Sequence, residues 1–251
     1  MAGYWGPVTA SIDCCEKNFE ISQYAGEFFN TVSNVPMILL ALIGLCSTIG
    51  QGFEKRFSVL HLSSIVIGIG SILFHATLKY GQQQSDETPM VWLMLLYIYV
   101  LYSPDWHYRS TMPTFLFLYG TAYAICHALF HFRLVYQLQF TFLCLLCLPR
   151  MYKYYMYTTE VPARRLGHMY VISITSGGIL WLVDRNLCSR ISSLPFNPQG
   201  HAWWHVLFGF STYFGNTFLQ FCRAQQLEWN PELRYVGGLL PYVRIVKSKT
   251  D

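Results

Sequence analysis

The sequence predicts an all-α membrane protein, a seven-transmembrane helix bundle with a lumenal N-terminus and a cytosolic C-terminus. Of its 251 residues, 53% are hydrophobic and only 12% are charged, about half the charged share of an average soluble domain. Apolar stretches of roughly 17 to 23 residues recur along the chain, and each is long enough to cross a hydrocarbon core of about 30 Å. These stretches predict a single domain, residues 1–251, with no separate soluble part.

The expected spans are 28–50, 57–78, 88–104, 112–130, 134–149, 166–184 and 201–222. Tyr, Ser and Gln residues dilute the apolar character of the third and fifth spans. This division predicts a lumenal segment at 1–27, a helix bundle at 28–222 and a cytosolic tail at 223–251. The N-terminal segment does not predict a cleaved signal peptide, because no basic start precedes an apolar run.

The Lys and Arg residues between the spans predict the orientation, because cytoplasmic loops carry an excess of both. One alternating set of loops holds twelve of the 17 Lys and Arg residues, and the other set holds the remaining five. The N-terminus belongs to the poorer set and is therefore expected on the lumenal side. The net charge of +4 needs no nucleic acid to explain it, since anionic lipid headgroups suffice.

Most of the eight cysteines lie within the spans, where a free Cys acts as a small hydrophobic residue. Cys14, Cys15 and Cys188 instead fall on the expected lumenal side, where disulfides persist. We expect a bond between Cys15 and Cys188, which would tie the N-terminal segment to the loop before the last span.

Several polar side chains are expected at one depth in the membrane, and each is a functional candidate because its burial is costly. The second span ends in GSILFHATLKY, with His75 near the lumenal end and Ser71 one turn deeper on the same face. The motif HAWWH opens the seventh span with His201 and His205 one turn apart. The loop KYGQQQSDETPM brings Asp86 to the start of the third span.

Three imidazoles with one open position are a ligand set of catalytic zinc, which lowers the pKa of a bound water to about 7. The spacing alone is not specific, because CHALFHF places His127 and His131 in the same way. HAWWH also lacks the Glu of the metalloprotease helix motif, since Ala202 stands there. Interfacial histidines that bind headgroups or carbonyls therefore remain an alternative.

The strings GYWGPVTASIDCCEKN, EFFNTVSN, GSILFHATLKY, DETPM and HAWWH, in this order, resemble the alkaline ceramidases. These are seven-span enzymes of endoplasmic reticulum and Golgi membranes, and the resemblance covers essentially the whole chain. It implies zinc-dependent, calcium-regulated hydrolysis of the ceramide amide bond to a sphingoid base and a fatty acid. The implied zinc ligands are His75, His201 and His205, and the implied catalytic residues are Ser71 and Asp86.

The catalytic roles that we expect follow from the chemistry of these two side chains. Asp86 would take a proton from the attacking water and pass it to the leaving amine. Ser71 would form a hydrogen bond either with the developing oxyanion or with the water at the metal. His127 and His131 match no motif of the family, and we expect surface or packing roles for them, as for His61, His107 and His168.

The resemblance also implies a regulatory calcium site in the N-terminal segment, built from oxygen ligands as calcium prefers. Its implied members are the side chains of Asp13, Glu16, Asn18 and Glu27 and the backbone carbonyl of Cys14. Relatives have Trp at the position of Cys14. The alternative is that Asp13-x-x-Glu16 is a helix capping box. Because Glu27 begins the first span, it is expected to transmit order to the bundle.

Aromatic residues and one acidic residue flank the expected zinc site. Trp203 and Trp204 are expected at the membrane interface, where such rings are enriched, and lining of the lipid channel is the second possibility. In the family the second Trp of this motif lies close to the site, which implies a substrate-lining role for Trp204. Asp184, near Trp181 at the end of the sixth span, is either a solvated helix end or a partner of a ligating His.

Three other function classes fit parts of the pattern. A seven-span lipid-sensing receptor resembling the adiponectin receptors would share the three histidines, but such receptors have the opposite orientation and a long cytosolic N-terminal domain. A lipid transporter or haem-binding bundle is disfavoured because the sequence has no pair of Gly/Pro-broken spans. A related hydrolase acting on a phospholipid ester or a lipid-anchored protein remains open. The expected partners are the bilayer and a ceramide, dihydroceramide or phytoceramide substrate, without an obligate protein partner.

Overall fold

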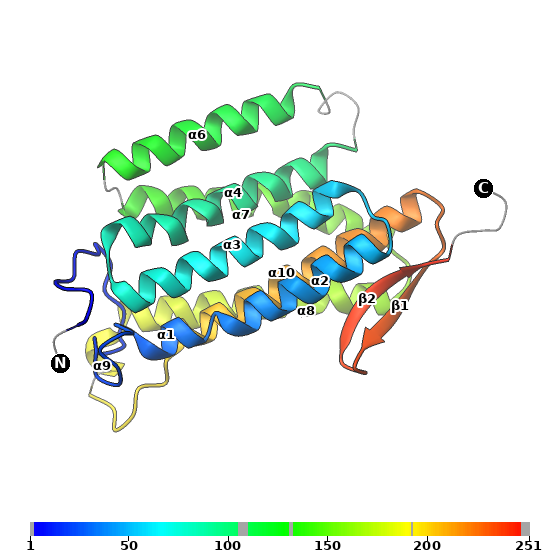
Figure 1. Cartoon of the computed structure of the whole chain (residues 1–251). Helices are drawn as coiled ribbons and strands as arrows, with labels where there is room; N and C mark the ends of the chain where they lie inside the picture. Colours follow the sequence, from blue (N-terminus) through cyan, green and yellow to red (C-terminus); the bar gives the residue numbers. More distant parts are fainter. Residues whose placement is uncertain (1–2, 105–109, 131–132, 192, 247–251) are drawn as a thin grey trace.

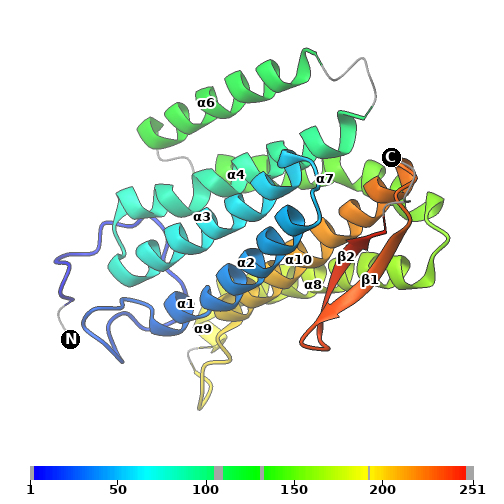
Figure 2. The same cartoon turned by 45° about the vertical axis from the view of Figure 1, so that its right-hand side comes forward.

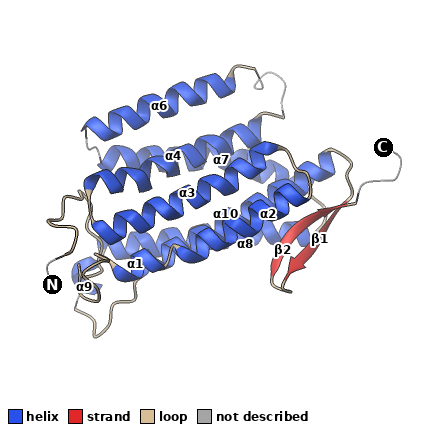
Figure 3. Cartoon of the chain, in the orientation of Figure 1, coloured by secondary structure: helices blue, strands red, loops and turns tan. Residues whose placement is uncertain are grey.

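In a computed structural model of the chain, residues 3–104, 110–130, 133–191 and 193–246 are described. Long helices lie roughly along one common direction, and a short hairpin flanks one end of the bundle (Figures 1 and 3). The helices are α1 (Phe28–Val32), α2 (Val35–Gly50), α3 (Lys55–Thr77), α4 (Tyr80–Tyr102), α6 (Met112–Phe130), α7 (Arg133–Tyr157), α8 (Val161–Asn186), α9 (Cys188–Ile191) and α10 (Gly200–Gln226). The strands are β1 (Pro231–Val236) and β2 (Leu240–Ile245).

Within the described residues, five helical segments are long and apolar enough to cross a membrane, which makes the chain a multi-pass membrane protein. They are Phe28–Gly50, Lys55–Thr77, Met112–Phe130, Leu134–Tyr157 and Val161–Asn186. α4 and α10 have 23 and 27 residues, long enough for a span, but they carry more polar side chains. The expectation of seven spans therefore rests on these two helices.

α10 is the central helix of the bundle. It packs along α8 and also contacts α2 and α3, while α3 lies between α2 and α4 (Figure 2). α4 in turn contacts α6 and α7, whose outer faces expose large apolar side chains. Apolar residues on the outside suit lipid, and α10 can hold polar residues because protein surrounds it.

Helix α4 begins earlier than the sequence analysis expected, so Asp86 lies in the second turn of a helix rather than in a loop. The connection from α3 is only two residues long, because Leu78 adopts a left-handed conformation and reverses the chain at once (φ 52°). The Gln-rich run that follows is compatible with a helix, since Gln has a good helix propensity. α7 and α8 likewise extend beyond the apolar stretches.

The expectation of an all-α chain misses the hairpin β1–β2, which lies in the expected cytosolic tail. Gly237 and Gly238, both with positive φ, form its turn, a conformation that glycine adopts at little cost. The hairpin packs on the bundle through Val243, which is buried, and through the Tyr213 hydroxyl, which donates to the Pro241 carbonyl at 2.9 Å. Only one face of β2 is buried, so its hydrophobic alternation is short and weak.

The expected disulfide is confirmed. Cys15 and Cys188 are bonded, with their Cα atoms 5.3 Å apart and a sequence separation of 173. The bond fixes the non-helical N-terminal segment against α9, and Asn197 adds a hydrogen bond from its side-chain amide to the Cys15 carbonyl at 2.9 Å. The segment is therefore held over the end of the bundle at which α3 ends and α10 begins (Figure 1).

Candidate metal centre

Three imidazoles converge at this end of the bundle. His75 comes from the last turn of α3, and His201 and His205 come from the first two turns of α10. The ring centroids are 5.1 Å apart for His75 and His201, 4.9 Å for His75 and His205, and 4.7 Å for His201 and His205. The end of α3 and the start of α10 therefore lie at the same depth, as the sequence analysis expected, and the three rings are close together.

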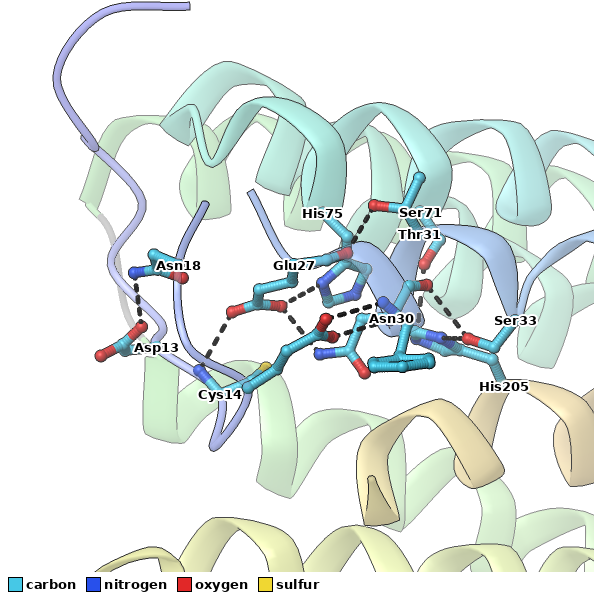
Figure 4. Close-up of polar contacts among 12 residues, drawn as sticks. Asp13, Cys14, Asn18, Glu27, Asn30, Thr31, Ser33, Ser71, His75 and His205 are labelled. Carbon is cyan, nitrogen blue, oxygen red and sulfur yellow. Dashed lines mark hydrogen bonds and ion pairs between the residues drawn. The ribbon is translucent and has the colours of Figure 1, made fainter. Parts of the chain in front are cut away.

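Glu27 contacts one side of the His75 ring (Figure 4), and His201 and His205 lie next to the same ring. His75 Nδ1 lies 2.6 Å from Glu27 Oε2, and both side chains are almost completely buried. Among the described residues, none hydrogen-bonds His75 Nε2. When Nδ1 donates its proton to Glu27, Nε2 presents a lone pair, which is how a carboxylate orients a metal-binding histidine.

His205 is oriented by the junction between α1 and α2. Its Nδ1 lies 2.8 Å from Ser33 Oγ and 3.3 Å from Asn34 Nδ2, while its Nε2 lies 3.5 Å from Ser71 Oγ. The sequence analysis did not identify Ser33 or Asn34, and it assigned Glu27 to calcium alone. Glu27, Ser33 and Asn34 all belong to the polar string EFFNTVSN, which begins an apolar span at the depth of the histidines. This string is the sequence signal that could have identified them as partners of the histidines.

Asp184 supports the start of α10 and thereby the backbone of His201. Its carboxylate accepts hydrogen bonds from the backbone N–H groups of Gly200, His201 and Cys15, which satisfies donors that a helix N-terminus leaves unpaired. Gly200 permits this approach, since a Cβ there would lie 2.8 Å from the Leu180 carbonyl oxygen. Asp184 is therefore buried and hydrogen-bonded rather than a solvated helix end, and it acts on His201 through the backbone.

Cys14 lies at the metal centre itself, a position that the sequence analysis did not anticipate. Its thiol and the ligand atoms of His75 and His201 lie within 4.8 Å of one another. Its backbone N–H points to Glu27 Oε1 at 3.3 Å. Burial, followed by the negative charge of Glu27, raises the pKa of the Cys14 thiol well above its ordinary value. Without a cation nearby, Cys14 thus stays a neutral thiol.

Ser71 and Asp86 adjoin the histidines. Ser71 lies one turn before His75 on α3, and its side chain is hydrogen-bonded to the Asp86 carboxylate. α3 and α4 approach closely here because Gly70 has no side chain, and a Cβ on Gly70 would overlap the Ser85 carbonyl. Ser71 and Asp86 therefore lie together next to His205, at the common depth that the sequence analysis expected.

A cavity of about 310 Å³ adjoins two of the three histidines and is lined by Ser71, Asp86, His201, His205 and Trp204. Its remaining wall is mostly apolar and includes Met37, Ile67, Phe74, Met90, Phe140 and Phe208. Trp203 is 54% exposed on the outer surface, so the two tryptophans have different environments. A small polar group beside an apolar chamber suits an amphiphilic ligand.

The expected calcium ligands divide into two groups. Asp13 and Asn18 lie together, with Asn18 Nδ2 donating to Asp13 Oδ1 at 3.3 Å (Figure 4). Glu27 lies near them through its contact with Cys14. Carboxylate and amide oxygens are therefore available beside the Cys14 backbone, and this donor chemistry fits calcium.

Glu16 accepts the backbone N–H groups of Phe29 and Asn30 at 2.7 and 2.9 Å and so caps α1. The capping-box alternative for Asp13 and Glu16 is wrong, because no helix begins at Asp13. Burial raises the pKa of Glu16 although the two backbone hydrogen bonds oppose this shift. A bound cation would lower the cost of holding this carboxylate close to Glu27.

The other described histidines lie outside the metal centre. His61 is buried beside Asn216, with 3.4 Å between Nδ1 and the amide nitrogen, and His168 contacts the Tyr155 hydroxyl at 2.9 Å. His127 pairs with Glu87 at 2.7 Å, which is a more specific contact than the packing role we expected. His107 and His131 lie outside the described residues.

Comparisons with known proteins agree with this arrangement. Residues 6–244 match a family model described as Ceramidase. The chain is 59% identical over 251 residues to "Alkaline ceramidase" of Arabidopsis thaliana, covering 100% of this chain and 98% of the relative. It is 31% identical to "Alkaline ceramidase 3" of Mus musculus, covering 96% and 94% of the two chains. For "Alkaline ceramidase YPC1" of Saccharomyces cerevisiae the identity is 29%, with 94% and 84% covered.

Proposed function

The chain belongs to the ceramidase family and is an amidohydrolase, and on that premise we propose that it hydrolyses the ceramide amide bond with a zinc ion. The observation that carries the proposal is the buried Nε2 of His75, which has no partner among the described residues and faces two further imidazoles beside an apolar cavity. His75, His201 and His205 would hold the ion. A zinc ion bound there supplies polarisation of the amide carbonyl and lowers the pKa of a water to about 7.

The residues of the chain perform the remaining steps. Glu27 holds the His75 ring in one tautomer, and Ser33 helps to position the His205 ring through its contact with Nδ1. Asp86 accepts the proton of the attacking water and transfers it to the leaving nitrogen as the amide bond breaks. Ser71 donates a hydrogen bond to the oxygen on which negative charge develops, and loss of one such donor costs about 100-fold or more in rate.

The cavity supports a substrate with a small polar centre and long apolar chains. Its polar groups gather around Ser71, Asp86 and the histidines, and Trp204 forms part of the adjoining apolar wall. This arrangement lets the amide reach Asp86 while the hydrocarbon chains stay away from water. Ceramide, dihydroceramide and phytoceramide all satisfy these requirements.

We also propose that calcium regulates the enzyme through Asp13, Asn18, Glu16, Glu27 and the Cys14 carbonyl. The support is that Glu27 contacts both the proposed calcium site and the histidine cluster. One of its oxygens accepts a hydrogen bond from the Cys14 N–H, and the other lies 2.6 Å from His75 Nδ1. An ordered N-terminal segment would thereby hold the His75 ring in place. Addition of calcium should raise activity and thermal stability together, and a calcium-specific chelator should lower both.

The proposed enzyme has seven spans, with α4 and α10 as the third and seventh, and it resides in the endoplasmic reticulum or the Golgi apparatus. The metal centre and the Cys15–Cys188 disulfide would then lie on the lumenal side, and the hairpin β1–β2 on the cytosolic side. Lumenal placement is supported by the disulfide, because such bonds persist in oxidising compartments. Cysteine labelling of residues in the hairpin and in the N-terminal segment from each side of sealed microsomes would test this orientation.

The decisive assay for the reaction measures fatty acid release by the purified protein from ceramide, with and without a zinc chelator. His75→Ala and His201→Ala should abolish release while the thermal unfolding transition persists. His168→Ala, a histidine substitution outside the metal centre, should retain activity. Full activity in either metal-centre variant would refute the zinc assignment. Release from a phospholipid ester but not from ceramide would instead favour a related hydrolase.

A further inference from the structure

A chain of hydrogen bonds leads from the N-terminal segment into the cavity wall through α4. The Ser11 backbone N–H donates to Gln83 Oε1 at 2.8 Å, and Gln83 Nε2 donates to Glu87 Oε1 at 3.0 Å. Glu87 Oε2 lies 2.7 Å from His127 Nε2. Gln83, Glu87 and His127 are all buried, so two directed contacts hold the Glu87 carboxylate in place.

The His127 side of this pair is rigid. Its ring lies between the rings of Tyr123 and Tyr136, with centroid distances of 5.5 and 5.6 Å and interplanar angles of 18° and 25°. Stacking on both faces restricts rotation of the imidazole, so the nitrogen that meets Glu87 keeps its direction. Glu87 is thus anchored from α6 as well as from the N-terminal segment.

Glu87 lines the same cavity as Asp86, its neighbour in sequence. An ionised carboxylate has about four acceptor positions, and Gln83 and His127 use one on each oxygen. Glu87 can therefore accept further hydrogen bonds from a molecule in the cavity. A buried pair of hydrogen-bonded polar side chains stabilises a fold little compared with apolar packing of the same volume, so stability alone does not account for Glu87.

We propose that Glu87 is a specificity-determining residue, which accepts hydrogen bonds from the hydroxyl groups of the sphingoid backbone. This inference rests on the proposed hydrolysis of ceramide. The two hydroxyl groups of that backbone lie within a few bonds of the amide nitrogen, and consecutive Cα atoms lie about 3.8 Å apart. An amide positioned at Asp86 therefore leaves a hydroxyl within reach of Glu87, whereas the fatty acyl chain has no such donor.

The test compares kcat/KM for ceramide with kcat/KM for two analogues that lack either the primary or the secondary hydroxyl. Wild type should prefer ceramide over at least one analogue by roughly 10- to 100-fold, the range for a hydrogen bond to a charged group. Glu87→Gln should reduce this preference to about threefold or less, chiefly by lowering kcat/KM for ceramide. Glu160→Gln, the same change at an exposed carboxylate outside the cavity, should keep the preference.

His127→Gln provides a second variant that leaves the carboxylate but removes its anchor. It should weaken the preference through KM more than through kcat, and it decides the matter if Glu87→Gln does not fold. An unchanged preference in the folded variants would overturn the inference, as would a wild type that hydrolyses ceramide and both analogues equally. A wild type that hydrolyses none of the three substrates would instead refute the proposed function.

Discussion

Glu27→Gln should weaken zinc binding by about tenfold, because Glu27 is the buried acceptor of the His75 imidazole. In wild type the carboxylate lies 2.6 Å from Nδ1, and Glu27 is only 1% exposed. The amide keeps an acceptor oxygen but loses the charge. Hydrogen bonds to charged groups contribute about 1.5–3 kcal/mol and neutral ones about 0.5–1.5 kcal/mol. The difference of about 1–1.5 kcal/mol corresponds to roughly five- to twelvefold in the dissociation constant.

The measurement is a competition titration of zinc between the purified protein and a chromogenic chelator of known affinity. A calcium-specific chelator in all samples separates this effect from that of the proposed calcium site. Glu20→Gln is the matched control, because Glu20 lies in the same segment but is exposed, with its side chain 61% accessible. A folded Glu27→Gln protein with the zinc affinity of wild type would contradict the role of Glu27 in orienting His75.

Three further predictions concern stability, each measured as the Tm of purified protein. Cys188→Ser should lower the free energy of unfolding by about 2–5 kcal/mol, because it removes the covalent link between two residues with a sequence separation of 173. A Tm equal to that of wild type would refute this prediction. Burial alone would raise the pKa of Glu54, but hydrogen bonds from Arg223 and the charge of Arg56 hold it below its ordinary value. The stabilisation is therefore present above about pH 4.3 and disappears as pH falls through the lowered pKa, so the Tm difference between wild type and Glu54→Gln should shrink below about pH 4. Gly70→Ala should lower the free energy of unfolding by about 1–3 kcal/mol, because the added methyl group overlaps the Ser85 carbonyl. Gly81→Ala should leave stability nearly unchanged, because a Cβ on Gly81 would contact no other atom.

Helix geometry predicts that the histidines of the cluster lie at one depth, but His127 and His131 have the same spacing, so the family resemblance was needed to select His75, His201 and His205. His201 and His205 lie on one face of α10 because they are four residues apart. His75 lies next to them because the C-terminal end of α3 and the N-terminal end of α10 are at the same end of the bundle. The Cys15–Cys188 bond is predictable for a similar reason, since few cysteines lie outside the spans. Alternation of direction and a depth along each helix place these residues at the same end of the bundle, but they do not identify the metal ligands.

The partners of the histidines could not be predicted in the same way. Glu27 and Ser33 lie 48 and 172 residues from the histidines they contact, and their orientation depends on the break between α1 and α2. The Glu87–His127 pair depends on the packing of α6 against α4. The polar string EFFNTVSN marks Glu27 and Ser33 as candidates, but no local pattern predicts which histidine each one contacts. The sequence did not predict the hairpin, because only a few of its side chains are buried and the strands therefore lack a clear alternation of apolar and polar residues.

The low hydropathy of α4 and α10, the two helices proposed as additional spans, has a reason that bears on function. Lipid selects apolar side chains only where it touches a helix, and α10 is enclosed by α2, α3 and α8. Asn216 and Gln220 are therefore buried in α10 with hydrogen-bond partners, such as the Tyr97 hydroxyl, which donates to Asn216 Oδ1 at 2.5 Å. The same enclosure allows α10 to carry two imidazoles and α4 to carry two adjacent carboxylates. Polar chemistry inside a membrane protein thus requires helices that the lipid does not contact, and these are the helices whose hydropathy is lowest.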